Sequence, residues 1–235
     1  MNGVIAQYSR VYLDNLIQYN RAISQRNRQL KDFAARGHFN REMLEIWDEQ
    51  LIRYGEPLYD ERCRFVEDLQ PVFGNFYEHV SGNRESVTLN YQAQLQGSGF
   101  REGLKNSLEK DRILQYTTFG IHKDDLGMDL GEHSLKKNGS QGQQKTFLVA
   151  LKLAEFEFIR KLMEVPPILL LDDIFDKFDA YRVKQIISLV AENNFGQIFI
   201  TDTNESRLMG ILREIPAEHS VFRIFSGDRV EIMEE

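Results

Sequence analysis

The sequence lacks three features that would assign it to common protein classes. Its single cysteine, Cys63, excludes an internal disulfide framework and a cysteine-based metal cluster. No run of about eighteen apolar residues and no secretory signal is present, so we expect a cytoplasmic protein without a membrane span. No stretch matches G-x-x-x-x-G-K-[ST], the loop that binds nucleotide phosphates. What remains is a chain of 235 residues, 42% of them hydrophobic, enough for one or two packed domains.

Charge is segregated along the chain. The formal net charge of −7 excludes a uniformly basic surface, yet residues 21–41 are mainly basic and residues 42–80 mainly acidic. Either two oppositely charged helices pair with each other, or the basic segment faces phosphates. Since no zinc finger or similar reading motif is present, any DNA contact would be independent of base sequence. The candidate DNA contacts are Arg21, Arg26, Arg28, Lys31 and Arg36.

The spacing of apolar residues predicts two domains. Over the first eighty residues the apolar side chains recur three, four or seven positions apart, which predicts a small antiparallel helical domain. From residue 87 to 95 the period becomes two, typical of a strand with one solvated face. We therefore expect a helical domain over residues 1–83 and a second domain over residues 84–235. Breaks or bends in the helices are expected at Gly37, Pro57, Pro71 and Gly74.

Helical and strand patterns alternate in the second part, which predicts an α/β fold with a mostly parallel sheet. The expected elements are a helix over 100–115, a loop over 120–138, a helix from 140, a strand over 168–171, a helix over 179–192, a strand over 197–201, a helix from 204, and a hairpin of 221–225 with 229–232.

Two carboxylates follow the apolar run 168–171. The run fits a strand buried on both faces, and open α/β sheets bind ligands at the carboxyl ends of their strands. There, Asp172 could hold magnesium and Asp173 could orient a water molecule. The alternative is that acidic residues simply end a buried strand.

A second polar feature is the expected helix start at Ser140. Free backbone amides, a hydroxyl and the positive end of the helix dipole would converge at Gln141, Gly142 and Gln143, where an anion fits. The alternative is an ordinary helix cap followed by polar residues. The helix start, the strand end and the turn at Asp179 together indicate part of an ATP site more specifically than any one of them does alone.

These motifs resemble the RecF family of SMC-like ABC ATPases. The similar stretches are Ser140-Gln141-Gly142-Gln143-Gln144-Lys145-Thr146 with residues 150–155, the run 168–173, Gly120-Ile121-His122-Lys123-Asp124-Asp125, and Gln25-Arg26-Asn27 with Leu30-Lys31. The resemblance spans nearly the whole chain. It implies the C-terminal part of an ABC/SMC-like ATPase head together with an antiparallel helical domain.

The resemblance also implies roles for single residues. Ser140, Gln141, Gly142 and Gln143 would form the ABC signature, which acts in trans on the ATP of a second subunit. Asp172 would bind Mg²⁺, Asp173 would take the catalytic-base position, and Asp179 would be the D-loop aspartate. Asp202 stands where many ABC ATPases have a switch histidine, and His122 is a candidate interface residue. The family's Ser-Glu-Leu-Asp is replaced by Asp176-Lys177-Phe178-Asp179, and a proline by Ile121.

The family's partners follow from the same resemblance. An ATP-dependent homodimer would close around DNA and aid recombinase loading at gapped DNA, with RecO and RecR as partners. Because the chain lacks the phosphate loop, it would be a C-terminal portion, and we expect it to bind ATP weakly or not at all by itself.

Two readings from other classes are open. The chain could be a non-catalytic module that contacts only DNA or protein. Alternatively, Asp172-Asp173-Ile174-Phe175-Asp176 matches the D-D-x-x-D motif with which isoprenoid synthases hold magnesium and diphosphate. That motif belongs on a helix of an all-helical fold, whereas here it follows an apolar strand.

Overall fold

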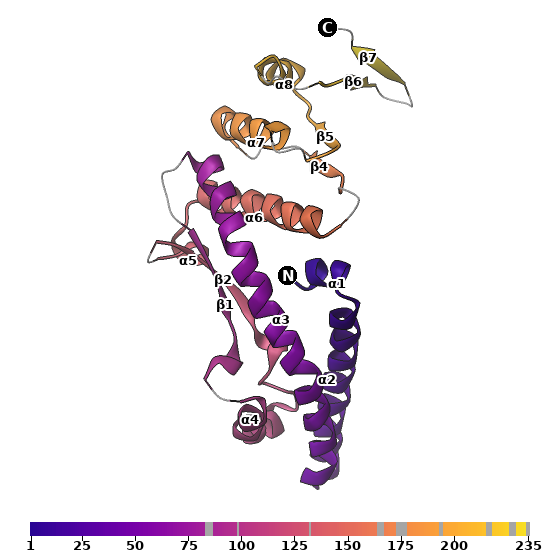
Figure 1. Ribbon diagram of the computed structural model, residues 1–235. Helices are drawn as coiled ribbons and strands as arrows, with labels where there is room; N and C mark the ends of the chain where they lie inside the picture. Colours follow the sequence, from indigo (N-terminus) through magenta and orange to yellow (C-terminus); the bar gives the residue numbers. More distant parts are fainter. Residues whose placement is uncertain are drawn as a thin grey trace. The chain divides into compact units, whose positions relative to one another are not determined.

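The chain forms two units, residues Met1–Pro167 and Ile168–Glu235, each described by itself (Figure 1). The structure, a computed structural model, describes residues 1–82, 87–97, 99–131, 133–163, 167–172, 178–192, 195–214, 218–225 and 229–233. Of the helices described there, none is both long and apolar enough to cross a membrane. The division expected after residue 83 stays a prediction; it falls within the first unit, where α3 packs on β1 and α6.

Three helices begin the first unit: α1 (Asn2–Tyr8), α2 (Arg10–Arg36) and α3 (Arg41–Ser81). Helices α2 and α3 lie side by side and run in opposite directions (Figure 1). Gly37 ends α2 with φ of 64°, a left-handed conformation that glycine adopts without strain. Asn40 then caps α3 by accepting a hydrogen bond from the Met43 amide. The helical period and the break at Gly37 are therefore confirmed.

Breaks at the two prolines and at Gly74 do not occur, because α3 continues through Pro57 and Pro71 to Ser81; bends at these positions stay a prediction. A proline inside a helix costs about 3 kcal/mol. This cost is offset by burial, since α3 contributes much of the apolar core of the unit. Phe65 packs on Phe158 at 5.1 Å between ring centroids, and Phe73 packs on Phe147 at 4.6 Å, which holds α6 (Gln141–Leu162) against α3.

A small antiparallel sheet in the order β1-β2-β3 completes the first unit. Its strands are β1 (Val87–Gln92), β2 (Asp125–Leu130) and β3 (His133–Ser134), and the other elements are η1 (Gln94–Gln96), α4 (Phe100–Leu114), η2 (Ile121–Lys123) and α5 (Leu135–Asn138). The strand expected over 87–95 is confirmed as far as Gln92, whereas Gln94–Gln96 form η1. The loop expected over 120–138 is wrong. It contains β2, which pairs with β1 so that Val87 lies opposite Leu130.

The second unit contains β4 (Leu169–Asp172), α7 (Ala180–Glu192), β5 (Ile198–Thr201), α8 (Glu205–Leu212), β6 (Val221–Ile224) and β7 (Val230–Met233). Strands β4 and β5 are parallel, and β6 and β7 form the expected antiparallel hairpin. The chain therefore has an α/β fold, as predicted. Parallel pairing occurs, among the described strands, between β4 and β5.

Strand β4 is not buried on both faces by the described residues. Leu171 packs, together with Ile200 of β5, on the core formed by Val183, Ile187 and Ile211. On the other face Leu170 is 69% exposed and Phe199 48% exposed. One face of this strand pair is thus apolar and open.

Candidate functional site

Ser140 begins α6 with a complete capping box. Its hydroxyl accepts a hydrogen bond from the Gln143 amide at 3.2 Å, and the Gln143 side chain accepts one from the Ser140 amide at 2.8 Å. The side chains of Ser140 and Gln141 are exposed. The helix start therefore forms where the sequence predicts it. The hydrogen bonds observed here are those of an ordinary helix cap, the alternative given above. The anion-binding role of this helix start stays a prediction.

The position of this helix start is held by packing. A Cβ atom at Gly139 would lie 2.6 Å from the backbone oxygen of Leu135, so the close approach of α5 to the start of α6 requires glycine here. Two turns into the helix, Phe147 is buried against Phe73 and Tyr77 of α3. The exposed first turn of α6 is thus held in place by packing within the first unit.

In the second unit, Asp172 ends β4, as predicted. It lies opposite Thr201, the last residue of β5, and one of its carboxylate oxygens accepts a hydrogen bond from the Thr201 hydroxyl. Both side chains are exposed at the carboxyl ends of parallel strands. Carboxylate and hydroxyl oxygens are ligands that suit Mg²⁺, so the residues present fit that ion. Asp173 lies outside the described residues.

Asp179 caps α7. One carboxylate oxygen accepts the Arg182 amide at 2.9 Å, and the other lies 2.7 Å from the Arg182 guanidinium. The hydrogen bond from the Arg182 amide is the main reason why the pKa of Asp179 is below its usual value, and the guanidinium adds to the effect. An exposed, ionised carboxylate is therefore fixed at this helix start.

Asp202 follows directly after β5. One of its oxygens accepts the Asn204 amide at 2.5 Å, while the other is buried and has no hydrogen-bond partner among the described residues. The structure thus places Asp172 and Asp202 in the same unit, at the ends of paired strands.

His122 is packed inside the first unit. Its Nε2 lies 3.0 Å from the Thr117 carbonyl oxygen, and its Nδ1 lies 3.1 Å from the Tyr19 hydroxyl. A carbonyl only accepts, so Nε2 carries the proton and Nδ1 accepts from Tyr19. Burial lowers the pKa of His122 and favours this neutral form. Both ring nitrogens are engaged, so a role at an interface stays a prediction that would require these bonds to break.

Arg26 is wrong as a DNA contact, because its side chain is 0% exposed. The guanidinium donates to Asp48 at 2.6 Å, to Asp111 at 2.6 Å and to the Thr117 hydroxyl at 3.0 Å. It thereby ties α2 to α3 and to the end of α4. For Arg26, the correct interpretation of the charge pattern is therefore that the basic helix pairs with the acidic one.

The other four basic candidates, Arg21, Arg28, Lys31 and Arg36, are exposed on α2. Arg21 and Arg28 are seven positions apart and Lys31 follows three later, so these three lie along one face of the helix. The buried Tyr19, Leu30 and Phe33 occupy the opposite side. Their role in DNA binding stays a prediction.

Sequence reasoning missed a second buried arginine, Arg62. It donates to the Tyr12 hydroxyl at 3.0 Å and to the Ile121 carbonyl at 2.7 Å, and lies 3.7 Å from Asp124. The Tyr91 hydroxyl donates to Asp124 at 2.6 Å. This network fixes the turn that holds His122. The available signal was the position of Arg62 four residues after Leu58 and seven before Leu69, on the apolar side of α3.

Comparisons with known proteins give one consistent result, although no protein-family profile matches the chain. The DNA replication and repair protein RecF of Parabacteroides distasonis is 48% identical over 232 residues, which are 99% of the chain and 62% of that protein. The protein of the same name from Phocaeicola vulgatus is 45% identical over 232 residues, with 98% and 62% covered. The chain thus spans 62% of the length of these relatives.

Solved structures agree with the sequence relatives. The recombination mediator protein RecF-ATPrS of the RecFOR pathway matches with a TM-score of 0.78 and 28% identity, over 99% of the chain and 62% of that protein. The Smc head domain bound to the C-terminal domain of ScpA from Pyrococcus furiosus matches with a TM-score of 0.50 and 18% identity, over 99% and 56%. The second likeness concerns the fold alone.

Proposed function

We propose, for a chain that is RecF-like along its whole length, that it forms part of an ATP-dependent DNA-binding clamp in recombinational DNA repair and replication-gap processing. The observation that carries the proposal is the exposed and capped first turn of α6 at Ser140, in a chain that is similar to the solved RecF-ATPrS. We place the protein in the cytoplasm, with RecR and RecO as partners and recombinase loading as the outcome.

Each nucleotide would contact two copies of the protein. Ser140, Gln141, Gly142 and Gln143 would contact the γ-phosphate of ATP held by a second copy, because a helix start with free amides favours an anion brought to it from outside. Asp172 would hold Mg²⁺ for the chain's own nucleotide. The ion would neutralise phosphate charge when bound. Dimerisation and ATP binding would then be one linked equilibrium.

The remaining candidates in the second unit would act around the same nucleotide. Asp173 would orient the attacking water, and Asp179 would contact the second copy from the start of α7. Asp202 would stand in the switch position, where its buried oxygen, unpartnered among the described residues, could accept a hydrogen bond.

DNA would bind to the outer face of α2. The four exposed basic residues there would contact phosphates, while Arg26 would support them only by holding α2 in place. Such contacts are independent of base sequence and are weakened by salt.

The test exploits the expected action in trans. The tagged chain is mixed with full-length RecF of Parabacteroides distasonis, with and without ATP, and the mixed dimer is captured by the tag. We expect capture only with ATP, and loss of capture in Ser140→Arg, whose side chain would block the phosphate. Asn106→Arg, which adds the same charge at an exposed position of α4, serves as the matched control and should behave as the wild type.

Two results would contradict the proposal. Capture that is independent of ATP, or unaffected by Ser140→Arg, would favour a non-catalytic module that binds protein without nucleotide. In a parallel titration of the chain alone, micromolar ATP binding would contradict the expectation that it cannot hold nucleotide without a phosphate loop.

A further inference from the structure

A turn directly after α4 displays an aromatic ring on the surface of the first unit. The side chain of Tyr116 is 41% exposed, and it is the one exposed Phe, Tyr or Trp side chain among the described residues of that unit. The preceding Gln115 has φ of 57°, and no other described residue except glycine has a positive φ. This left-handed conformation is strained for a residue with a Cβ atom, and such strain persists only where surrounding contacts hold it.

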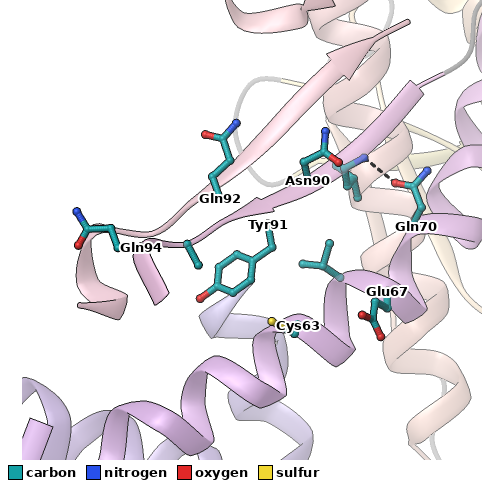
Figure 2. A pocket seen from close by; sticks show the side chains of 10 residues that line it. Cys63, Glu67, Gln70, Asn90, Tyr91, Gln92 and Gln94 are labelled. Carbon is teal, nitrogen blue, oxygen red and sulfur yellow. Dashed lines mark hydrogen bonds between the residues drawn. The ribbon is translucent and has the colours of Figure 1, made fainter. Parts of the chain in front are cut away.

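Hydrogen bonds to two other elements provide those contacts. The Thr117 amide donates to Oδ1 of Asn27 at 2.7 Å, which fastens the turn to α2. Further along, the Gly120 amide donates to Oε1 of Gln94 at 3.0 Å. Figure 2 shows Gln94 past the end of β1. The backbone around Tyr116 is therefore held in place, so little further ordering of the backbone is needed when a ligand packs on the ring.

Positive charge lies close to this ring. The ammonium group of Lys123 is 5.1 Å from the centre of the Tyr116 ring, a cation–π contact. Arg28 is the next residue of α2 after Asn27, and Lys31 lies one helical turn beyond Asn27. Two exposed cations that we assign to DNA phosphates are thus within one helical turn of the residue that anchors the turn.

The carboxylates that follow Lys123 are each paired with a basic group. Asp124 lies 3.7 Å from the Arg62 guanidinium, and Asp125 lies 4.0 Å from the Lys136 ammonium. These ion pairs offset part of the negative charge beside the ring. A phosphate that approaches Lys123 is therefore repelled less than the sequence Lys123-Asp124-Asp125 alone suggests.

We propose that Tyr116 stacks on an unpaired base of DNA whose phosphates contact the exposed basic residues of α2. This role rests on the DNA contacts proposed above and adds a contact to a base. Every base has a π-face, so such stacking is independent of sequence, whereas the bases of a duplex are already stacked on one another. Lys123 would meet the phosphate of the stacked nucleotide. A blunt duplex would therefore use the cations but not the ring.

The test compares two DNA probes in fluorescence anisotropy with the full chain at one salt concentration. One probe is a blunt duplex, and the other is the same duplex with a short oligothymidine overhang. We expect the overhang probe to bind about tenfold more tightly, within the range that stacking of one base supplies. Tyr116→Ala should abolish this preference and leave the affinity for the blunt duplex unchanged.

Three further variants separate stacking from other effects. Tyr116→Phe keeps the ring and should keep the preference, which excludes a role of the hydroxyl group alone. Tyr181→Ala removes an exposed tyrosine of α7 and should leave both affinities unchanged. The double variant Arg28→Ala, Lys31→Ala should weaken binding of both probes by the same factor, because phosphate contacts do not distinguish them.

Failure of the stacking role can be distinguished from failure of the proposed DNA contacts. Equal affinity of the wild type for the two probes, or a preference that survives Tyr116→Ala, would overturn stacking and leave the contacts of α2 intact. A loss in Tyr116→Ala that is the same for both probes would make Tyr116 a contact to duplex and would also overturn it. Absence of binding to either probe would overturn both proposals.

Discussion

Replacement of Arg26 by Ala should destabilise the first unit itself, whereas the charge pattern of the sequence predicts only weaker DNA binding. The guanidinium is completely buried and bonds Asp48, Asp111 and Thr117, which belong to α3, α4 and the following loop. Without it, the Asp111 carboxylate, which is also fully buried, loses its counter-charge. Removing one partner of a buried ion pair costs about 3–5 kcal/mol. We therefore expect a loss of about 4 kcal/mol, a large part of a typical domain's stability.

The assay is urea unfolding followed by far-ultraviolet circular dichroism, with Arg28→Ala as the matched control. Arg28 lies two positions further along α2 but is exposed, so its replacement should change the free energy of unfolding by less than about 0.5 kcal/mol. Equal midpoints for the two variants would refute the structural role of Arg26.

The pH dependence gives a second check on Arg26→Ala. Burial raises the pKa of Asp48 in the folded chain, and attraction to Arg26 opposes this rise. Without Arg26 the folded state takes up the proton more readily than the unfolded chain, so the stability loss should shrink as the pH falls toward about 4. A loss that grows on acidification would contradict this account.

Three further predictions concern the exposed stripe, the packed histidine and the helix cap. The double variant Arg28→Ala, Lys31→Ala should reduce the slope of log affinity for DNA against log salt by about 2, measured by fluorescence anisotropy; an unchanged slope would exclude this stripe. Because burial lowers the pKa of His122, the unfolded chain protonates first, so stability should fall as the pH drops through about 6.5; His122→Asn should flatten that part of the curve. Ser140→Ala should cost about 1 kcal/mol in thermal unfolding, whereas Ser140→Asp, which retains a cap, should cost less.

Elements whose ends carry local signals could be predicted from the sequence. Gly37 ends α2 and Ser140 begins α6 because a left-handed glycine and a serine cap act on the backbone within a few residues. Strand β2 could not be predicted in this way. Its sequence, Asp125-Leu-Gly-Met-Asp-Leu130, mixes acidic residues and glycine with apolar ones, and it is a strand because β1 supplies a partner. Gly127 lies opposite Asn90 in this pairing, where a Cβ atom would lie 3.2 Å from the Asn90 carbonyl oxygen.

The misassigned Arg26 shows where a charge pattern is insufficient. A count of basic residues along a segment does not say which side chains are buried, so a buried arginine and an exposed one contribute equally to it. The helical period does indicate which side chains are buried. Arg26 lies seven residues after Tyr19 and four before Leu30, on the buried side of α2. Read together, charge and period separate Arg26 from Arg28. The acidic partner Asp111 is 85 residues away and could not be identified by either signal.

The open face of β4 follows from the same reasoning. An uninterrupted apolar run predicts that both faces of a strand are covered, and the described residues cover only the face that carries Leu171. Burying a side chain such as Leu170 or Phe199 stabilises a protein by about 1.5–3 kcal/mol, so a partner that covers this face would stabilise the second unit appreciably. The chain covers 62% of the length of these relatives. Asp172 leaves the same strand at its carboxyl end, so whatever covers β4 would also border the proposed magnesium site.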